Sequence, residues 1–214
     1  MRLLSVNVAL PRAIPYRGRT VWTGIFKEPV AGRIRVRPLN LDGDRQADLR
    51  YHGGPDKAVY AYDRANTDYW EARFERTLPD GAFGENLTVR GMPEDEVAIG
   101  DRYRVGTAVL EVSEPRSPCY KLGVKMGSTS FFADFLRTGK TGFYLRVIEA
   151  GEVGAGDAIT VVSRDAEAVT VAETSRFLFS KRRDPQVARR ALRVASLSAG
   201  LRSAFAAAIP DGGP

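Results

Sequence analysis

The chain has 214 residues, of which 43% are hydrophobic and 27% charged; these proportions are typical of a soluble globular protein and exclude a disordered one. One cysteine excludes an intramolecular disulfide, one histidine leaves no ligand set for a structural zinc site, and no apolar run approaches the roughly 20 residues that span a bilayer. The net charge of +6 suggests an anionic partner, although a solvated basic surface also explains it. We therefore expect a cytoplasmic protein.

Residues 1–165 are predicted to be rich in β-strands. The N-terminus, residues 1–8, has the pattern of a first strand and not of a signal peptide. Short segments bounded by Gly, Pro or Asp predict strands at residues 21–25, 32–39, 86–90 and 144–148. A hairpin is predicted at residues 101–113, where Gly106-Thr107 fits a II′-type turn.

Two helical segments are predicted to interrupt the strands. Trp70 and Phe74 have the i, i+4 spacing of one helix face, and we expect both in the core. Ser128 is predicted to cap a second helix. The apolar stripe of that helix is formed by Phe131, Phe132, Phe135 and Leu136.

The chain changes character after about Val162, where three short helices are predicted. The first covers residues 171–181, Asp184-Pro185 opens the second and Ser198 caps the third. Helices of this length are marginal alone, so they must pack on one another or on the strands. The tail, residues 210–214, is expected to fray.

Cys119 is the first candidate for chemistry. A lone cysteine is most often a small buried hydrophobe. Here Pro115 and Pro118 predict a stiff loop after a strand, and Arg116 and Lys121 flank the thiol. Nearby cations favour a thiolate, which can act as a nucleophile or as a soft ligand for a redox metal.

The loop that begins at His52 is a weaker candidate. Gly-Gly-Pro-Asp is ordinary turn chemistry, and a lone histidine is more often structural than catalytic. Gly53 and Gly54 would still let the backbone approach a ligand, and Lys57 could hold an anion, although the spacing is not that of a phosphate-binding P-loop. The segment around Asn86 has the pattern of a turn that enters a strand.

Five motifs follow one another in a recognisable order. They are Thr-Gly-Ile-Phe-Lys (23–27), Gly-Asp…Gln-Ala-Asp (43–48), His-Gly-Gly…Asp-Lys-Ala-Val-Tyr (52–60), Phe-Gly-Glu-Asn-Leu (83–87) and Pro-Arg…Pro-Cys…Lys-Leu (115–122). This series resembles the MOSC-domain family, and within it the YiiM-type branch. Residues 171–205 resemble the three-helix domain of that branch. The resemblance implies a mixed, mainly β fold: a MOSC-type β-barrel domain with peripheral helices (1–165) and a small C-terminal three-helix domain (166–214).

The resemblance also implies an activity. YiiM-type proteins use a molybdenum cofactor (Mo-molybdopterin) to reduce N-hydroxylated bases such as 6-hydroxylaminopurine, a detoxification of mutagenic analogues that takes electrons from a flavoprotein. By this similarity Cys119 would be the metal ligand, and His52 is a candidate to deliver a proton to the departing oxygen. The residues expected to bind the cofactor are Arg12, Lys27, His52, Gly53, Gly54, Lys57, Asn86, Arg116 and Lys121.

Two other functions are compatible with the sequence. Cys119 could carry sulfur as a persulfide in a cofactor-binding module, which would be detected as a persulfide without molybdenum. The basic segment 176–202 could bind nucleic acid, although its arginines also fit the solvated faces of small helices, and we do not expect this partner. No membrane association is expected, and a homodimer is left open.

Overall fold

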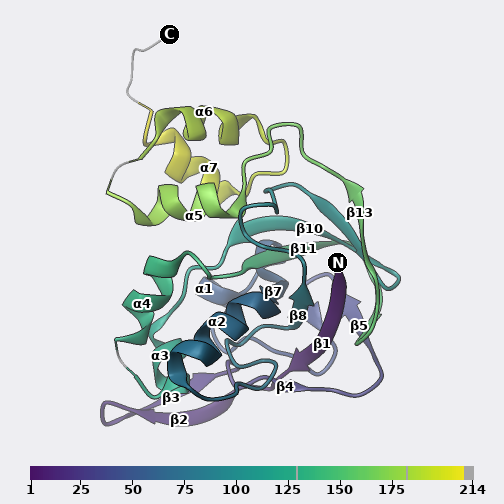
Figure 1. The fold of residues 1–214 in the computed structure, drawn as a ribbon, viewed down its shortest axis with the longest axis vertical. Coiled ribbons are helices and arrows are strands. Elements are labelled where there is room, and N and C mark those ends of the chain that lie inside the picture. The colour runs from purple at the N-terminus through teal and green to yellow at the C-terminus, as the bar shows by residue number, and fades with distance from the viewer. Residues whose placement is uncertain (129, 182, 210–214) are drawn as a thin grey trace.

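The computed structural model describes residues 1–128, 130–181 and 183–209, and its centre is an eight-stranded mixed sheet (Figure 1). Neighbouring strands follow the order β13-β9-β10-β11-β7-β8-β1-β4. Only the β7–β8 pair is parallel; the other pairs of this sheet are antiparallel. The strands are β1 (Arg2–Val8), β4 (Glu28–Pro29), β7 (Val59–Asp63), β8 (Leu87–Arg90), β9 (Arg102–Val105), β10 (Ala108–Pro115), β11 (Phe143–Glu149) and β13 (Ile159–Ser163).

Two smaller sheets complete the β-structure. Strands β12 (Gly151–Gly154), β5 (Arg33–Arg37) and β6 (Asn40–Leu41) form one, and the hairpin of β2 (Arg12–Tyr16) and β3 (Arg19–Thr23) forms the other. Each predicted strand overlaps an observed one. The predicted hairpin is β9–β10, and Gly106 has the positive φ of +56° that the first central residue of a II′ turn requires.

The expected β-barrel is not closed, which corrects the sequence-based prediction. The first residues of β1 approach the segment before β13 through an isolated bridge, Arg2 to Ala158, with a hydrogen bond from Leu3 N to Asp157 O of 2.9 Å. The last residues of β1 pair instead with β4. Because the outer edge of β1 is divided between two partners, no continuous ladder joins the ends of the sheet.

An aromatic cluster lies between the sheet and helices α2 (Arg64–Phe74), α3 (Tyr120–Met126) and α4 (Phe131–Thr138). Trp70 is fully buried there, 4.8 Å from the ring of Phe131 between centroids, as its helical spacing predicts. The predicted N-cap of α4 is wrong, since the cap is Ser130. Ser128 instead donates its N–H to Gly123 O (3.0 Å) and so belongs to the turn that ends α3.

The three C-terminal helices pack on the sheet and on one another. They are α5 (Val171–Phe179), α6 (Pro185–Arg193) and α7 (Ala199–Ala206), and their buried side chains join the main core of the sheet. The predicted caps Asp184 and Ser198 are confirmed by hydrogen bonds from Gln186 N and Leu201 N. Among the described residues, no helix is both long and apolar enough to cross a bilayer. The tail 210–214 lies outside the described residues.

Candidate functional site

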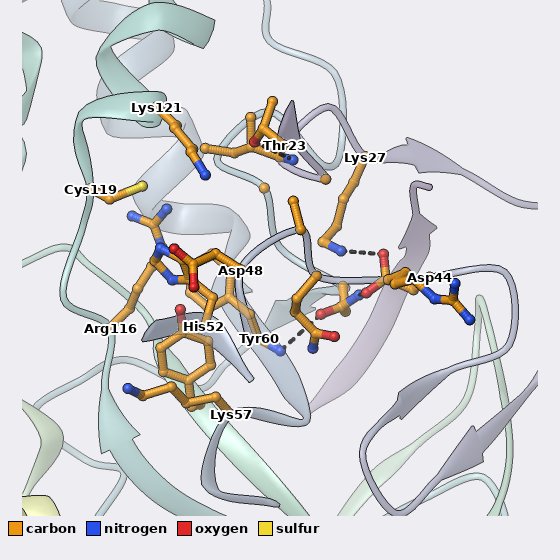
Figure 2. Close-up of a pocket in the computed structure, with 18 residues that line it drawn as sticks. Thr23, Lys27, Asp44, Asp48, His52, Lys57, Tyr60, Arg116, Cys119 and Lys121 are labelled. Carbon is orange, nitrogen blue, oxygen red and sulfur yellow. Dashed lines mark hydrogen bonds and ion pairs between the residues drawn. The ribbon is translucent and has the colours of Figure 1, made fainter. Parts of the chain in front are cut away.

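A pocket opens where the loops after β3 and β6 meet the loop between β10 and α3 (Figure 2). This inner pocket encloses about 600 Å³, part of it open to solvent. It is lined by Thr23, Gly24, Ile25, Lys27, Asp44, Arg45, Gln46, Ala47, Asp48, His52, Lys57, Tyr60, Gly84, Asn86, Arg116, Cys119, Lys121 and Tyr144.

Cys119 is positioned by the end of β10 and the start of α3. It is the N-cap residue of α3 with an extended backbone, but its side chain makes no capping hydrogen bond. The free thiol is half-buried, and Figure 2 shows it pointing into the pocket beside the guanidinium of Arg116. The thiol is therefore accessible to a ligand, and no capping hydrogen bond competes for it.

Arg116 is the most unusual residue of the pocket. It is 5% exposed, and its guanidinium carbon lies 4.9 Å from the ring centre of Tyr60 and 5.7 Å from that of Phe135. Its Nη1 is buried and has no hydrogen-bond partner among the described residues. An unsatisfied buried charged donor costs more than about 1–3 kcal/mol. An anionic acceptor in the pocket would relieve that cost.

A buried ion pair forms one wall of the pocket. Lys27 pairs with Asp44, whose other contacts are Ala9 N (2.9 Å) and the Asn86 amide (3.0 Å). The Asn86 carbonyl in turn accepts a hydrogen bond from Tyr60 N (3.1 Å). Burial lowers the pKa of Lys27, and the Asp44 carboxylate opposes that shift. This network is satisfied within the protein, so its first role is to hold the wall in place.

His52 ends the short helix α1 (Leu49–His52), which is followed by the 3₁₀ turn η1 (Pro55–Lys57). Its partial burial, and then the positive charges of Arg116, Lys121 and Lys57, lower its pKa to about 4. His52 is therefore neutral near pH 7 when the pocket is empty. An anion placed among these cations would raise its pKa again, because it would offset their charge.

The charge of the inner pocket is strongly positive. Five cationic side chains line it against two carboxylates: Lys27, Arg45, Lys57, Arg116 and Lys121 against Asp44 and Asp48. The pocket thus combines an accessible thiol with an excess of positive charge. That donor set fits a ligand that is anionic at one end and has a thiophilic centre at the other.

Most of the residues predicted from sequence meet here. Seven line the inner pocket: Lys27, His52, Lys57, Asn86, Arg116, Cys119 and Lys121. Three predicted residues do not line it. The guanidinium of Arg12 lies over the ring of Phe26 at 3.9 Å. Gly53 and Gly54 shape the loop, since a Cβ on Gly53 would lie 2.7 Å from Leu49 O and Gly54 has φ of +93°.

Sequence reasoning missed several lining residues. Asp44 was noted in a motif without a role, yet its carboxylate anchors Lys27 and Asn86. Tyr60 ended one of the five motifs and Tyr144 began a predicted strand, but neither was given a role, although both are buried beside Arg116. Both tyrosines lie in strand segments, and because every residue of β7 is buried, the strand pattern does not identify which face borders a pocket.

Comparison with known proteins gives two family matches. A MOSC-domain profile matches residues 48–160, and a profile for the YiiM-like 3-alpha helix domain matches residues 169–207. The chain is 40% identical over 203 residues to YflK of Bacillus subtilis (strain 168), covering 95% of this chain and 92% of YflK. It is 37% identical over 179 residues to YiiM of Escherichia coli (strain K12), covering 82% and 80% of the two chains.

A further relative and a solved structure extend these matches. A Gibberella moniliformis (strain M3125 / FGSC 7600) protein named Reductase is 36% identical over 151 residues, or 69% of this chain and 27% of that protein. The crystal structure of YiiM from Geobacillus stearothermophilus superposes with a TM-score of 0.80 at 33% identity, covering 96% of this chain and 97% of the other.

Proposed function

Because the chain belongs to the MOSC-domain family and carries a YiiM-like three-helix domain, we propose that it is a molybdenum-cofactor-dependent reductase of N-hydroxylated bases. The type substrate would be 6-hydroxylaminopurine. One observation carries the proposal: the buried Arg116 guanidinium, with Nη1 unpartnered, borders the same pocket as the free thiol of Cys119. The relative named Reductase supports redox chemistry, although this chain spans only about a quarter of it.

The pocket residues fit the cofactor. Its phosphate and pterin need hydrogen-bond donors and positive charge, which Arg116, Lys121 and Lys57 would supply. Among the described residues, no group of three or more His, Cys, Asp or Glu could hold a metal ion. A metal at Cys119 would therefore have to arrive with most of its ligands already attached. A dithiolene-bound molybdenum meets that requirement, and the thiolate of Cys119 would complete its coordination.

The bound cofactor would supply the two electrons that reduce the hydroxylamino group. With two protons, the N–O bond is replaced by N–H and the oxygen leaves as water. Within the protein, Cys119 would hold the metal and the cations would hold the cofactor, and His52 lines the same pocket as the thiol. An anionic cofactor would offset the cations that lower the pKa of His52, and the imidazolium could then give a proton to the departing oxygen and recover it from solvent. We further propose a flavoprotein as electron donor, in the cytoplasm, with a homodimer left open.

Metal analysis tests this function. The protein is produced in cells supplied with molybdenum cofactor, its molybdenum content is measured, and 6-hydroxylaminopurine is added with an artificial reductant. We expect about one molybdenum per chain and conversion of the substrate to adenine, whereas protein from molybdate-starved cells should be inactive. A chain without molybdenum that carries a persulfide on Cys119 would instead support the sulfur-carrier function.

A further inference from the structure

A second cavity, the outer chamber, adjoins the inner pocket at Cys119. It encloses about 970 Å³, part of it open to solvent. The outer chamber is lined by Asp48, Tyr51, His52, Lys57, Glu114, Ser117, Pro118, Cys119, Tyr120, Lys121 and Tyr144. Six of these residues also line the inner pocket, and Cys119 is one of them. The thiol therefore stands at the boundary between two cavities.

The two cavities differ in charge. Two lysines and two carboxylates line the outer chamber, so their charges balance, whereas the inner pocket has an excess of cations. Apart from tyrosines, Glu114 is the one ionisable residue in the described part of the chain that lines the outer chamber and not the inner pocket. An anionic cofactor is therefore favoured in the inner pocket, and an uncharged ligand is favoured in the outer chamber.

Two tyrosines from different elements line the outer chamber and do not line the inner pocket. Tyr51 belongs to α1 and is 61% exposed, and Tyr120 begins α3 and is 43% exposed. Tyr120 is already stacked on Tyr16 with 4.7 Å between ring centres. A planar ligand in the chamber would continue that stack or lie against Tyr51. Exposed aromatic rings of this kind are favourable walls for a flat heteroaromatic ring.

Glu114 provides a hydrogen-bond acceptor in the same chamber. Its side chain is only 18% exposed, and its one charged contact is Lys57 Nζ at 3.8 Å. No hydrogen bond reaches its carboxylate in the described part of the chain, and a partly buried carboxylate without donors is unfavourable. An N–H group on a ligand in the chamber would satisfy it.

We propose that the outer chamber is the substrate subsite, and that it binds an uncharged N-hydroxylated heteroaromatic base between Tyr51 and Tyr120, with a ring N–H donated to Glu114. The inference rests on the proposed reductase function and adds the residues that would bind the substrate and a preference for the free base over its nucleotide. The base would lie in the outer chamber and the cofactor in the inner pocket, and the two ligands would meet at the lining residues that the cavities share. A phosphorylated substrate is disfavoured, because its charge would face Glu114.

Binding of the reaction product tests the subsite independently of turnover. Adenine is titrated by calorimetry into protein loaded with molybdenum cofactor, and adenosine monophosphate is titrated in parallel. We expect adenine to bind at least about tenfold more tightly than the nucleotide. Tyr51→Leu and Tyr120→Leu should each weaken adenine binding by about 3- to 10-fold, the effect of losing one stacking partner. Glu114→Gln should weaken adenine binding and narrow the difference from the nucleotide.

Tyr69→Leu and Glu149→Gln are the matched controls, since both residues are exposed and neither lines the chamber. Molybdenum content should be unchanged in all five variants, and KM for 6-hydroxylaminopurine should rise in the three chamber variants while kcat changes little. If reduction occurs with unchanged KM in both tyrosine variants, the subsite is wrong and the reaction stands. If adenine binding depends on both tyrosines but no reduction occurs, the proposed reaction is wrong and the subsite stands.

Discussion

The inner pocket and the outer chamber share the residues around Cys119, yet they are built in opposite ways. The inner pocket has an excess of positive charge, one wall held by the Lys27–Asp44 pair, and a buried guanidinium whose Nη1 has no hydrogen-bond partner among the described residues. The outer chamber has balanced charge and exposed aromatic rings. The difference indicates that the two cavities have different roles. The inner pocket favours tight binding of an anionic cofactor, and the outer chamber favours weaker binding of a substrate that is released after each turnover.

Replacing the residue at the boundary should have the largest effect. We expect Cys119→Ser to reduce molybdenum content and reduction rate by at least about 100-fold, more than is lost when an outer-shell partner of a metal ligand is removed. The free energy of unfolding of the unloaded protein should change by less than about 1 kcal/mol, because the half-buried thiol makes no capping hydrogen bond. Metal analysis and chemical denaturation measure the two quantities. Full molybdenum content in the variant would refute the ligand assignment.

Loss of the Lys27–Asp44 pair should reduce the free energy of unfolding more than it reduces cofactor binding. Lys27→Met leaves the buried Asp44 carboxylate without its counter-ion, which should cost about 3–5 kcal/mol of unfolding free energy. The double variant Lys27→Met/Asp44→Asn should recover part of that loss, since the charge of the carboxylate is removed as well. Urea denaturation tests both variants. A stable Lys27→Met protein that only loses cofactor would instead make Lys27 a direct ligand of the cofactor.

Replacing Arg116 should reduce cofactor binding without reducing the stability of the unloaded protein. Arg116→Met removes a buried charge whose Nη1 has no partner in the described residues, so the unloaded protein should be unchanged or more stable by up to about 2 kcal/mol. The loaded variant should lose its cofactor at least about tenfold more readily, because a charge-assisted hydrogen bond is missing. Thermal unfolding and molybdenum release on dilution measure the two effects.

Arg102→Met is the matched control for Arg116, because its guanidinium pairs with the buried Glu111 at 2.6 Å. That variant should lose stability and keep the cofactor. If Arg116→Met behaves in the same way, the guanidinium is structural and the contrast between the two cavities loses its main support.

The smallest expected effect concerns the single histidine. His52 has a pKa of about 4 against an ordinary value near 6.5, so the unfolded chain binds a proton in this interval that the folded one does not. Stability should therefore fall as the pH drops from about 6.5 to 4, by about 1–2 kcal/mol after allowance for partial exposure. His52→Gln should lack that part of the loss, as denaturation at several pH values would reveal.

A proton NMR titration of tag-free protein follows His52 directly, since the chain has no other histidine. The pKa of His52 should be higher in Arg116→Met than in the wild type. In the wild type, the pKa of His52 should rise when the cofactor binds. An unperturbed value near 6.5 in the unloaded wild type would mean that the pocket cations do not reach the imidazole.

Local features of the fold were predictable from sequence. Asp184 and Ser198 cap their helices through hydrogen bonds to residues two or three positions away, and such contacts depend on little else. Ser128 is not the cap because α4 begins at Phe131, with Ser130 as its N-cap residue, while the backbone of Ser128 still belongs to the turn that ends α3. The prediction of a closed barrel was wrong because one edge of β1 pairs partly with β4 and partly with the segment before β13. That pairing is a property of the whole sheet and not of a local pattern.

The candidate site was predictable only as a set of residues. Motifs in five loops indicated Cys119, His52 and the surrounding cations, but not which charges are already paired. Lys27 and Asp44 lie 17 residues apart, and only the folded chain makes one the counter-ion of the other. Arg12 was expected in the pocket, yet β2 pairs it with Thr23 at the base of a hairpin and its guanidinium lies over Phe26. That Nη1 of Arg116 has no partner in the described part of the chain is a property of packing and leaves no trace in the sequence.

Strand β1 has a consequence for how this protein can be divided. The stretch that matches the MOSC profile begins at residue 48, but β1 lies inside the sheet, between β8 and β4. Residues before position 48 also supply Thr23, Lys27 and Asp44 to the inner pocket. A fragment cut at the profile boundary would lose an interior strand together with a wall of the site. The stretch that matches the family profile is thus shorter than the domain that folds. A transfer of this domain to another protein would have to include the N-terminal segment.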